Sequence, residues 1–157
     1  CCFARLGRGE EAYEHLSRLI TDFATDSLLD LHPPGLFQIE GNMGGAAAVV
    51  EMLLQSRNEE LRFLPALPAV WSAGHVRGLH ARGGYRIDIR WEACVVVEAT
   101  VMCSVSRTCR VNRSGGPYGV WDESGGRIPT TDGGVCIEFE VEAERPYTVK
   151  PAGESAR

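Results

Sequence analysis

The sequence predicts an α+β protein made of two units, a set of helices followed by an antiparallel, sandwich-like β domain. Apolar residues recur every three or four positions in the first third, whereas from His75 onward they alternate with polar residues. A proline-containing stretch, LRFLPALPAVW, separates the two patterns. Helices followed only by strands indicate separate units rather than one mixed sheet. We therefore expect a helical unit over 1–58 and a β domain over 59–157.

Composition and charge narrow the class of protein. Of the 157 residues, 44% are hydrophobic and 24% charged, which is typical of a globular chain. The net charge of -5 disfavours nucleic acid, because affinity for phosphates depends on Lys and Arg, and arginines such as Arg86 and Arg90 are scattered. No run approaches the roughly 20 apolar residues that a membrane span needs. We predict neither a nucleic-acid nor a membrane partner.

The first helical region indicates that other helices are needed to cover it. Residues Glu10–Phe23 place their apolar side chains on one face, with acids in the first turn where the helix dipole favours them. The start, CCFARLG, resembles a helix end closed by Gly7, and residue 1 is not Met. We therefore expect this chain to be part of a longer protein.

The Asn112-Arg113-Ser114 triplet matches the glycosylation pattern of secreted proteins, although it recurs by chance.

The segment Leu31–Gly45 is the strongest candidate for chemistry. It is not periodic, yet it places His32, Gln38, Glu40 and Asn42 close together in sequence. Loops that present polar groups from a rigid scaffold commonly have functional roles. The alternative interpretation is a proline-rich connection whose polar residues only cap the next helix.

A second helix is expected to follow this segment. Pro33 and Pro34 keep the preceding chain extended, and Asn42 is a plausible N-cap for a helix that runs to about Ser56. This helix is apolar on nearly all faces, which is typical of a helix buried in a larger helical body.

The β domain is predicted from alternation and turn residues. Gly83-Gly84 indicates a hairpin turn, and Asn112–Gly134 is rich in Gly, Ser and Asp and predicts a long loop. The end, PAGESAR, is expected to fray. The predicted strands are Tyr85–Glu92, Cys94–Met102, Thr108–Val111, Val135–Glu142 and Tyr147–Val149.

The cysteines and acids predict no metal or cofactor. There is no C-x-x-C pair and no Cys/His ligand spacing. We expect Cys94, Cys103 and Cys109 to be buried free thiols. A disulfide between Cys103 and Cys109 is the alternative. The acidic row at Glu138, Glu140 and Glu142 is better explained as an exposed strand face than as a calcium site.

Two tryptophans have both a structural and a functional interpretation, and one further acid has a structural one. Trp71 and Trp91 are suited to sugar stacking, but packing in the core or at a junction is the expected role. Asp88 alternates with the apolar row of its strand and is expected to be solvated.

Several motifs in fixed order resemble glycoside hydrolase family 95. They are ARLGxGExAY at 4–13, HPP and FQIEGN at 32–42, LPALPxxW at 64–71 and GxVxGLxARGGYxIDIxW at 74–91. The resemblance implies an (α/α)6 helical barrel followed by a C-terminal β-sandwich-like domain. It further implies an inverting α-L-fucosidase, typically acting on α-1,2-linked fucose of an oligosaccharide or glycan. This chain would hold the last barrel helices and the β domain.

The resemblance also implies site residues. The family has an Asp in FQIDGN that activates the attacking water with the help of upstream Asn side chains, and Glu40 occupies that position here. His32 is expected near the sugar, with Gln38 and Asn42 flanking it. The general acid and the water-positioning Asn residues would lie in the missing N-terminal part of the barrel, so we expect this chain to be inactive alone.

Two departures from the family pattern bear on the activity expected of the parent protein. Glu40 is one methylene longer than Asp, and a misplacement of about 1 Å can lower a rate on the order of 100-fold. Gly35-Leu36 also stands between HPP and FQI as an insertion. We expect reduced or altered activity in the parent protein. The alternative function is a non-catalytic β-sandwich module that binds carbohydrate or serves as a scaffold, with a vestigial helical stub.

Overall fold

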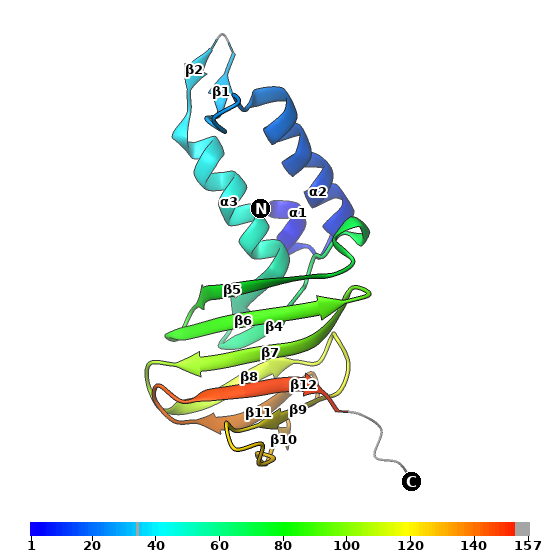
Figure 1. Cartoon of the computed structure of the whole chain (residues 1–157), viewed down its shortest axis with the longest axis vertical. Helices are drawn as coiled ribbons and strands as arrows, with labels where there is room; N and C mark the ends of the chain where they lie inside the picture. The colour runs from blue at the N-terminus through cyan, green and yellow to red at the C-terminus, as the bar shows by residue number, and fades with distance from the viewer. Residues whose placement is uncertain (34, 153–157) are drawn as a thin grey trace. The chain divides into compact units, whose positions relative to one another are not determined.

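The computed structural model describes residues 1–33 and 35–152, and it confirms an α+β protein with helices first and antiparallel-rich sheets after them (Figure 1). The chain forms two compact units. Unit 1 comprises Cys1–Leu53 and Pro65–Val70, and unit 2 comprises Leu54–Leu64 and the chain from Trp71 onward. The domain boundary after residue 58 stays a prediction.

Unit 1 is built from short helices. They are α1 (Cys2–Arg5), α2 (Gly9–Arg18), its π-helical continuation η1 (Leu19–Phe23) and α3 (Ile39–Leu53). Gly7, at a φ of 72°, ends α1 as predicted, because its N–H and that of Arg8 bond back to Ala4 and Phe3. The buried face is small and includes Ala4, Leu16 and Met52.

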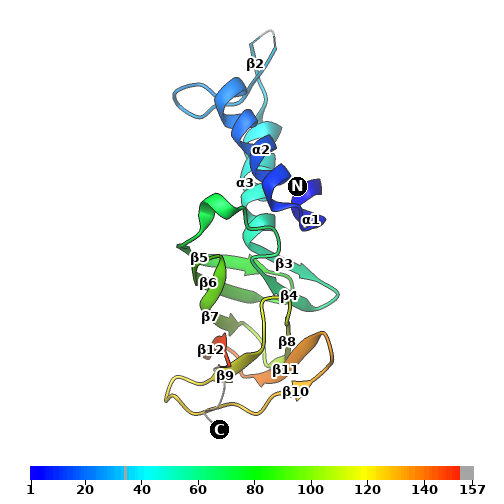
Figure 2. The ribbon, with the colours of Figure 1, turned by 90° about the vertical axis from the view of Figure 1, so that its right-hand side faces the viewer.

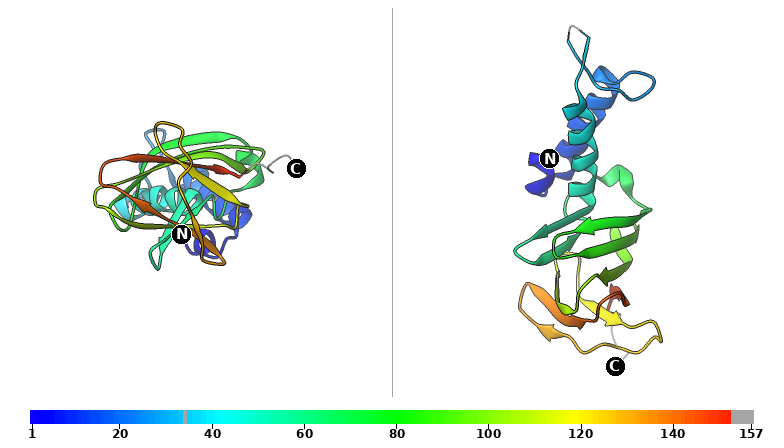
Figure 3. Two further views of the ribbon diagram at one scale, coloured as in Figure 1. Left: turned by 90° about the horizontal axis from the view of Figure 1, so that it is seen from below. Right: turned by 90° about the vertical axis from the view of Figure 1, so that its left-hand side faces the viewer.

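The segment between η1 and α3 is more regular than the sequence predicts. Strands β1 (Leu31–His32) and β2 (Leu36–Phe37) pair as a short hairpin that projects beyond the start of α3 (Figure 3). The N–H of Gln38 donates to the carbonyl of Asp30 at 3.0 Å, and the N–H of Gly41 donates to the carbonyl of Gln38. The helix therefore starts directly after the hairpin.

The prediction that Asn42 caps α3 was wrong. Asn42 lies inside the first turn of a helix that begins at Ile39, because the hairpin lets the helix start four residues earlier. The prediction that the helix reaches Ser56 was also wrong. Leu54 pairs with Phe63 in a sheet, so the chain leaves the helix after Leu53.

Unit 2 is a sandwich of two five-stranded sheets, which Figure 2 shows as separate layers. All strand pairs are antiparallel except β4 with β8. One sheet has the order β10-β11-β8-β4-β3, with bounds β3 Leu54–Arg57, β4 Glu60–Phe63, β8 Arg107–Asn112, β10 Thr131–Asp132 and β11 Cys136–Val141. The other has the order β5-β6-β7-β12-β9, with bounds β5 Gly74–Ala81, β6 Tyr85–Glu92, β7 Val95–Cys103, β9 Tyr118–Trp121 and β12 Pro146–Pro151. A 3-10 turn, η2 (Ala69–Trp71), precedes β5.

The core of unit 2 lies between these sheets. Alternation along the strands points one row of each sheet inward. Ile87, Val101, Val120 and Val149 are fully buried, and so is Val111 of the opposite sheet. The indole N–H of Trp91 donates to the carbonyl of Trp71 at 2.7 Å, which gives Trp91 the predicted packing role.

Four expectations for the β region were wrong. The predicted loop 112–134 contains β9 and β10, and the predicted connector LRFLPALPAVW begins with the last three residues of β4. Cys94 is exposed because Ala93 and Cys94 form the tight turn between β6 and β7, both at positive φ. Asp88 is not simply solvated, since its carboxylate accepts the N–H of Gly78 at 2.7 Å.

The cysteines of the described chain are free thiols, and Cys103, Cys109 and Cys136 are buried. The Cys103–Cys109 disulfide is therefore not formed. Within residues 1–33 and 35–152, no three His, Cys, Asp or Glu side chains gather as metal ligands. No helix of that part of the chain is both long and apolar enough to span a membrane. The frayed end predicted at 151–157 falls largely outside the described residues.

Candidate functional site

The four predicted site residues lie around the junction between the β1–β2 hairpin and α3. His32 ends β1, and its carbonyl accepts the N–H of Gly35 at 2.7 Å, which closes the hairpin turn. Gln38 precedes the helix, and Glu40 and Asn42 lie in its first turn. The side chains of His32, Gln38 and Glu40 are exposed.

Glu40 faces a cavity of about 270 Å³ in unit 1. The cavity lies between α1, α2 and α3, and its lining includes Phe3, His15 and Gly44. Among the described residues that line it, Glu40 is the only carboxylate. The first turn of a helix is a favourable place for a negative charge, because the unpaired N–H groups and the helix dipole point toward it.

Asn42 lies on another side of the same turn. Successive helical residues differ by about 100°, so residues two apart point in nearly opposite directions. Asn42 lines a second, apolar cavity of about 200 Å³ together with Asp30 and Gly41, and Glu40 does not line it. His32 and Gln38 line neither cavity. The described chain therefore does not bring the four predicted side chains into one pocket.

The side-chain amide of Asn42 holds the segment that precedes the hairpin. Its Oδ1 accepts the N–H of Asp30 at 2.9 Å, and its Nδ2 donates to the carbonyl of Leu28 at 2.5 Å. Both ends of the amide are thus engaged by backbone. This cross-link fixes the 28–30 backbone to the start of α3.

Asp30 is a site residue that the sequence pattern did not reveal. It is only 6% exposed, and its buried Oδ1 has no hydrogen-bond partner among the described residues. A Cβ on Gly41 would meet Oδ2 at 2.2 Å, so the carboxylate packs against the residue that follows Glu40. The available signal was a single acid inside the apolar run LLDL. A buried carboxylate without a full set of partners is costly, which marks this position for a role beyond packing.

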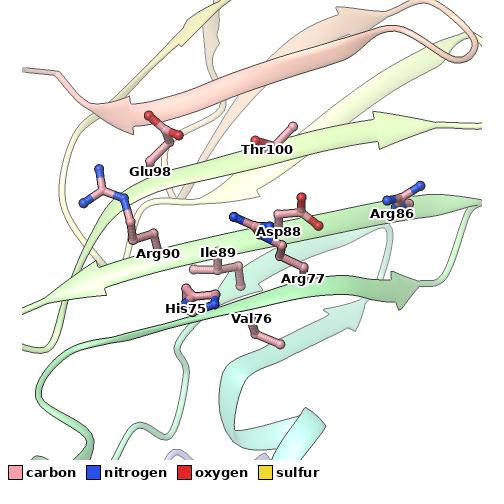
Figure 4. Close-up of a pocket in the computed structure, with 9 residues that line it drawn as sticks. All are labelled: His75, Val76, Arg77, Arg86, Asp88, Ile89, Arg90, Glu98 and Thr100. Carbon is pink, nitrogen blue, oxygen red and sulfur yellow. The ribbon is translucent and has the colours of Figure 1, made fainter.

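Unit 2 has a separate polar cavity of about 510 Å³ on its β5–β6–β7 sheet (Figure 4). Arg86 and Arg90 project from the same face of β6. Together with Arg77 of β5, they line this cavity. The residues that line this cavity are His75, Val76, Arg77, Arg86, Asp88, Ile89, Arg90, Glu98 and Thr100.

A second polar cluster of unit 2 is structural. Glu60 accepts hydrogen bonds from Arg62 at 2.6 Å, from Asn112 at 2.8 Å and from the Cys136 thiol at 2.9 Å. Burial alone would raise the pKa of Glu60, but these donors outweigh it and hold that pKa below its usual value. Burial and the neighbouring carboxylate raise the pKa of Cys136 to about 11, so this thiol stays protonated at neutral pH and is a poor nucleophile.

Two family profiles match nearly the whole described chain. The profile of the glycoside hydrolase family 95 C-terminal domain matches residues 55–149, and that of the glycosyl hydrolase family 95 catalytic domain matches residues 1–53. The chain belongs to glycoside hydrolase family 95. Its helices α1 to α3 thus lie in the part that matches the family's catalytic domain, and most of its sandwich lies in the part that matches the family's C-terminal domain.

Curated family 95 relatives cover most of this chain but extend far beyond it. Alpha-L-fucosidase 2 of Arabidopsis thaliana is 42% identical over 108 residues, which is 61% of this chain and 13% of that protein. Probable alpha-fucosidase A of Aspergillus oryzae is 35% identical over 125 residues, covering 70% of this chain and 17% of that protein. The corresponding Aspergillus niger protein is 33% identical over 112 residues, covering 62% and 14%. The chain thus spans about one seventh of the length of these relatives.

Proposed function

We propose that this chain is the C-terminal part of an inverting α-L-fucosidase that removes terminal fucose, typically α-1,2-linked, from an oligosaccharide or glycan. The observation that carries the proposal is the position of Glu40. It lies in the region that matches the catalytic-domain profile, on the first turn of a helix, where it lines a cavity. The names of the relatives supply the sugar.

In this mechanism Glu40 is the general base. It accepts a proton from a water molecule, which attacks the anomeric carbon on the face opposite the leaving oxygen. A second carboxyl group donates a proton to that oxygen, at roughly 6.5–9.5 Å from the first. Because Glu40 is the only carboxylate among the described residues lining its cavity, we infer that the acid comes from polypeptide outside this chain. The chain alone is therefore inactive.

The remaining residues of the segment position the base and the sugar. His32 and Gln38 are exposed and free to meet substrate, as the family resemblance implies. Asn42 flanks the site, and its two backbone bonds keep the hairpin fixed against the helix that bears Glu40.

The proposal also specifies a partner for unit 1. Large apolar side chains are more than half exposed at its surface, which is unusual unless further polypeptide covers them. They include Leu28, Leu36, Phe37 and Met43. We infer that the N-terminal part of the helical barrel of the parent protein buries this surface.

The test uses the full-length parent protein. Replacing Glu40 with Gln should lower turnover of a fucosylated oligosaccharide by about 100- to 10,000-fold, since a general base contributes on this order. Glu14→Gln, on the exposed side of α2, is the matched control and should leave turnover unchanged. Proton NMR of the first product should show the β-anomer of fucose. Retained turnover in Glu40→Gln, or a first product of α configuration, would overturn the assignment.

Two further measurements address the departures from the family pattern. The 157-residue chain by itself should release no fucose, and any release would contradict the inferred external acid. In the parent protein, Glu40→Asp should lower turnover if the inserted Gly35-Leu36 has adapted the backbone to the longer side chain. A gain in turnover would instead mark Glu40 as a damaging replacement.

The second hypothesis, a non-catalytic carbohydrate-binding role, concerns unit 2 alone. It is favoured by the polar cavity on the β5–β6–β7 sheet, which lies outside the segment that bears Glu40.

A further inference from the structure

The outer face of the β5-β6-β7-β12-β9 sheet presents polar side chains in register. Asp88 of β6 pairs with Thr100 of β7, Thr100 with Thr148 of β12, and Thr148 with Trp121 of β9. Strands lie about 4.8 Å apart, so this row extends about 14 Å across the sheet from Asp88 to Trp121. The 510 Å³ cavity occupies the β5–β7 end of the same face (Figure 4).

Most charges on this face are paired, but two arginines are not. Glu98 is 3.2 Å from Lys150, and Arg90 is 2.9 Å from Glu92. The carboxylate of Asp88 accepts the N–H of Gly78. Within the described part of the chain, no carboxylate forms an ion pair with the other two cations of the cavity, Arg77 and Arg86. Both are exposed, so the cavity offers two guanidinium groups with open donors.

Trp121 lies flat on the far end of the row. A Cβ on Gly119 would meet the six-membered part of the indole at 2.6 Å, so the ring covers the glycine and lies along the sheet. Trp121 is only partly buried, so part of this residue remains accessible. A flat aromatic surface beside hydroxyl and charged groups suits a sugar ring, which has an apolar face and a polar rim.

We propose that this outer face binds an acidic saccharide, with its carboxylate or sulfate groups on Arg77 and on Arg86 and another sugar ring on Trp121. Guanidinium groups present paired donors that match the geometry of such anions. This inference develops the carbohydrate-binding hypothesis for unit 2. It does not depend on the hydrolase proposal, because every residue in it belongs to unit 2.

Charge complementarity selects an acidic ligand over a neutral one. A neutral sugar would leave both guanidinium groups without a charged partner, whereas an acidic sugar would supply it. A long polyanion such as nucleic acid is less suitable, since Glu92, Asp88 and Glu98 lie on or beside the same face. Trp121 gives the saccharide a contact that charge alone does not provide.

The experiment uses isothermal titration calorimetry on the 157-residue chain at low and physiological salt. The probes are an oligogalacturonate for the carboxylate, a heparin-derived oligosaccharide for the sulfate, a neutral galactose oligomer and a single-stranded DNA oligonucleotide. The variants are the double substitution R77Q/R86Q, Trp121→Ala, and Arg57→Gln as the matched control. Arg57 is an exposed arginine on β3 of the opposite sheet.

Saturable binding of one acidic oligosaccharide is expected, with R77Q/R86Q weakening it about fivefold to tenfold, as for two exposed charge contacts. Trp121→Ala should weaken it by roughly fivefold or more, and Arg57→Gln should leave it unchanged. The acidic probe that binds identifies carboxylate or sulfate as the source. Equal binding of the neutral oligomer would overturn the acidic preference but keep a saccharide site. Absence of saccharide binding, equal binding of DNA, or an equal effect of Arg57→Gln would overturn the site itself.

Discussion

The two units of this chain use their apolar residues in opposite ways. In unit 2, Ile87, Val101 and Val120 are fully buried between two sheets. In unit 1, Leu36 is 68% exposed and Met43 is 64% exposed, although both lie in or beside regular elements. The same chain therefore contains one region with its own core and one with an open apolar surface.

This difference explains why function must be assigned differently in the two regions. A sandwich that buries its own core needs no other polypeptide to cover it, so a cavity on its outer face is a candidate ligand site by itself. A helical unit with exposed apolar faces positions its residues for other polypeptide to complete. In our proposals, Glu40 belongs to the second case, and the outer face of the β5-β6-β7-β12-β9 sheet belongs to the first.

The largest expected effect tests whether unit 2 has an independent core. Val101→Ala should lower the free energy of unfolding of unit 2 by about 2–3 kcal/mol, because it removes two buried methyl groups and leaves a cavity. Val95→Ala on the same strand should change it by less than about 0.5 kcal/mol, since Val95 is 49% exposed. Urea unfolding followed by tryptophan fluorescence measures this, because all three tryptophans lie in unit 2. Similar losses in both variants would remove the contrast between the units.

The next effect tests whether the candidate segment is packed despite the open surface of unit 1. Gly41→Ala places a methyl group against the Asp30 carboxylate and should cost about 1–3 kcal/mol, since a short side chain cannot move aside. Gly44→Ala, on the same helix, meets nothing within 4 Å and should stabilise the helix by about 0.5–1 kcal/mol. Helical circular dichroism and amide exchange at Asp30 and Gln38 report the change. Equal behaviour of the two variants would mean that Asp30 does not pack as described.

The fold could be predicted further than the site, and the reasons are physical. Alternation along Tyr85–Glu92 directly records which side chains face the core, so that strand and its hairpin turn were predictable. Strands β9 and β10 lie among Gly, Ser and Asp residues, whose local preference for loops is overridden by pairing with β12 and β11.

The site depended on contacts that sequence spacing does not encode. The motif predicted Glu40, but the buried position of Asp30 follows from the hairpin that folds Leu31 back onto Phe37. Likewise, Arg77 and Arg86 are nine positions apart and line one cavity only because β5 and β6 pair across the Gly83-Gly84 turn. A site whose residues are brought together by strand pairing can be recognised only once the strand register is known.

The smallest expected effect is the pH dependence contributed by Glu60. Its folded pKa lies below the value of 4.5 that applies to an unperturbed Glu, so at low pH the unfolded state binds more protons than the folded state. The stabilisation is therefore present at neutral pH and is lost as the pH falls below 4.5 toward the folded pKa. In Glu60→Gln the neutral-pH stability of unit 2 should fall by about 1 kcal/mol, and the loss on acidification should become shallower. Glu144→Gln, an exposed acid in a turn of unit 2, should keep the wild-type profile. Urea midpoints measured by tryptophan fluorescence between neutral and acidic pH test this, and parallel profiles for wild type and Glu60→Gln would show that the cluster around Cys136 does not stabilise the ionised carboxylate.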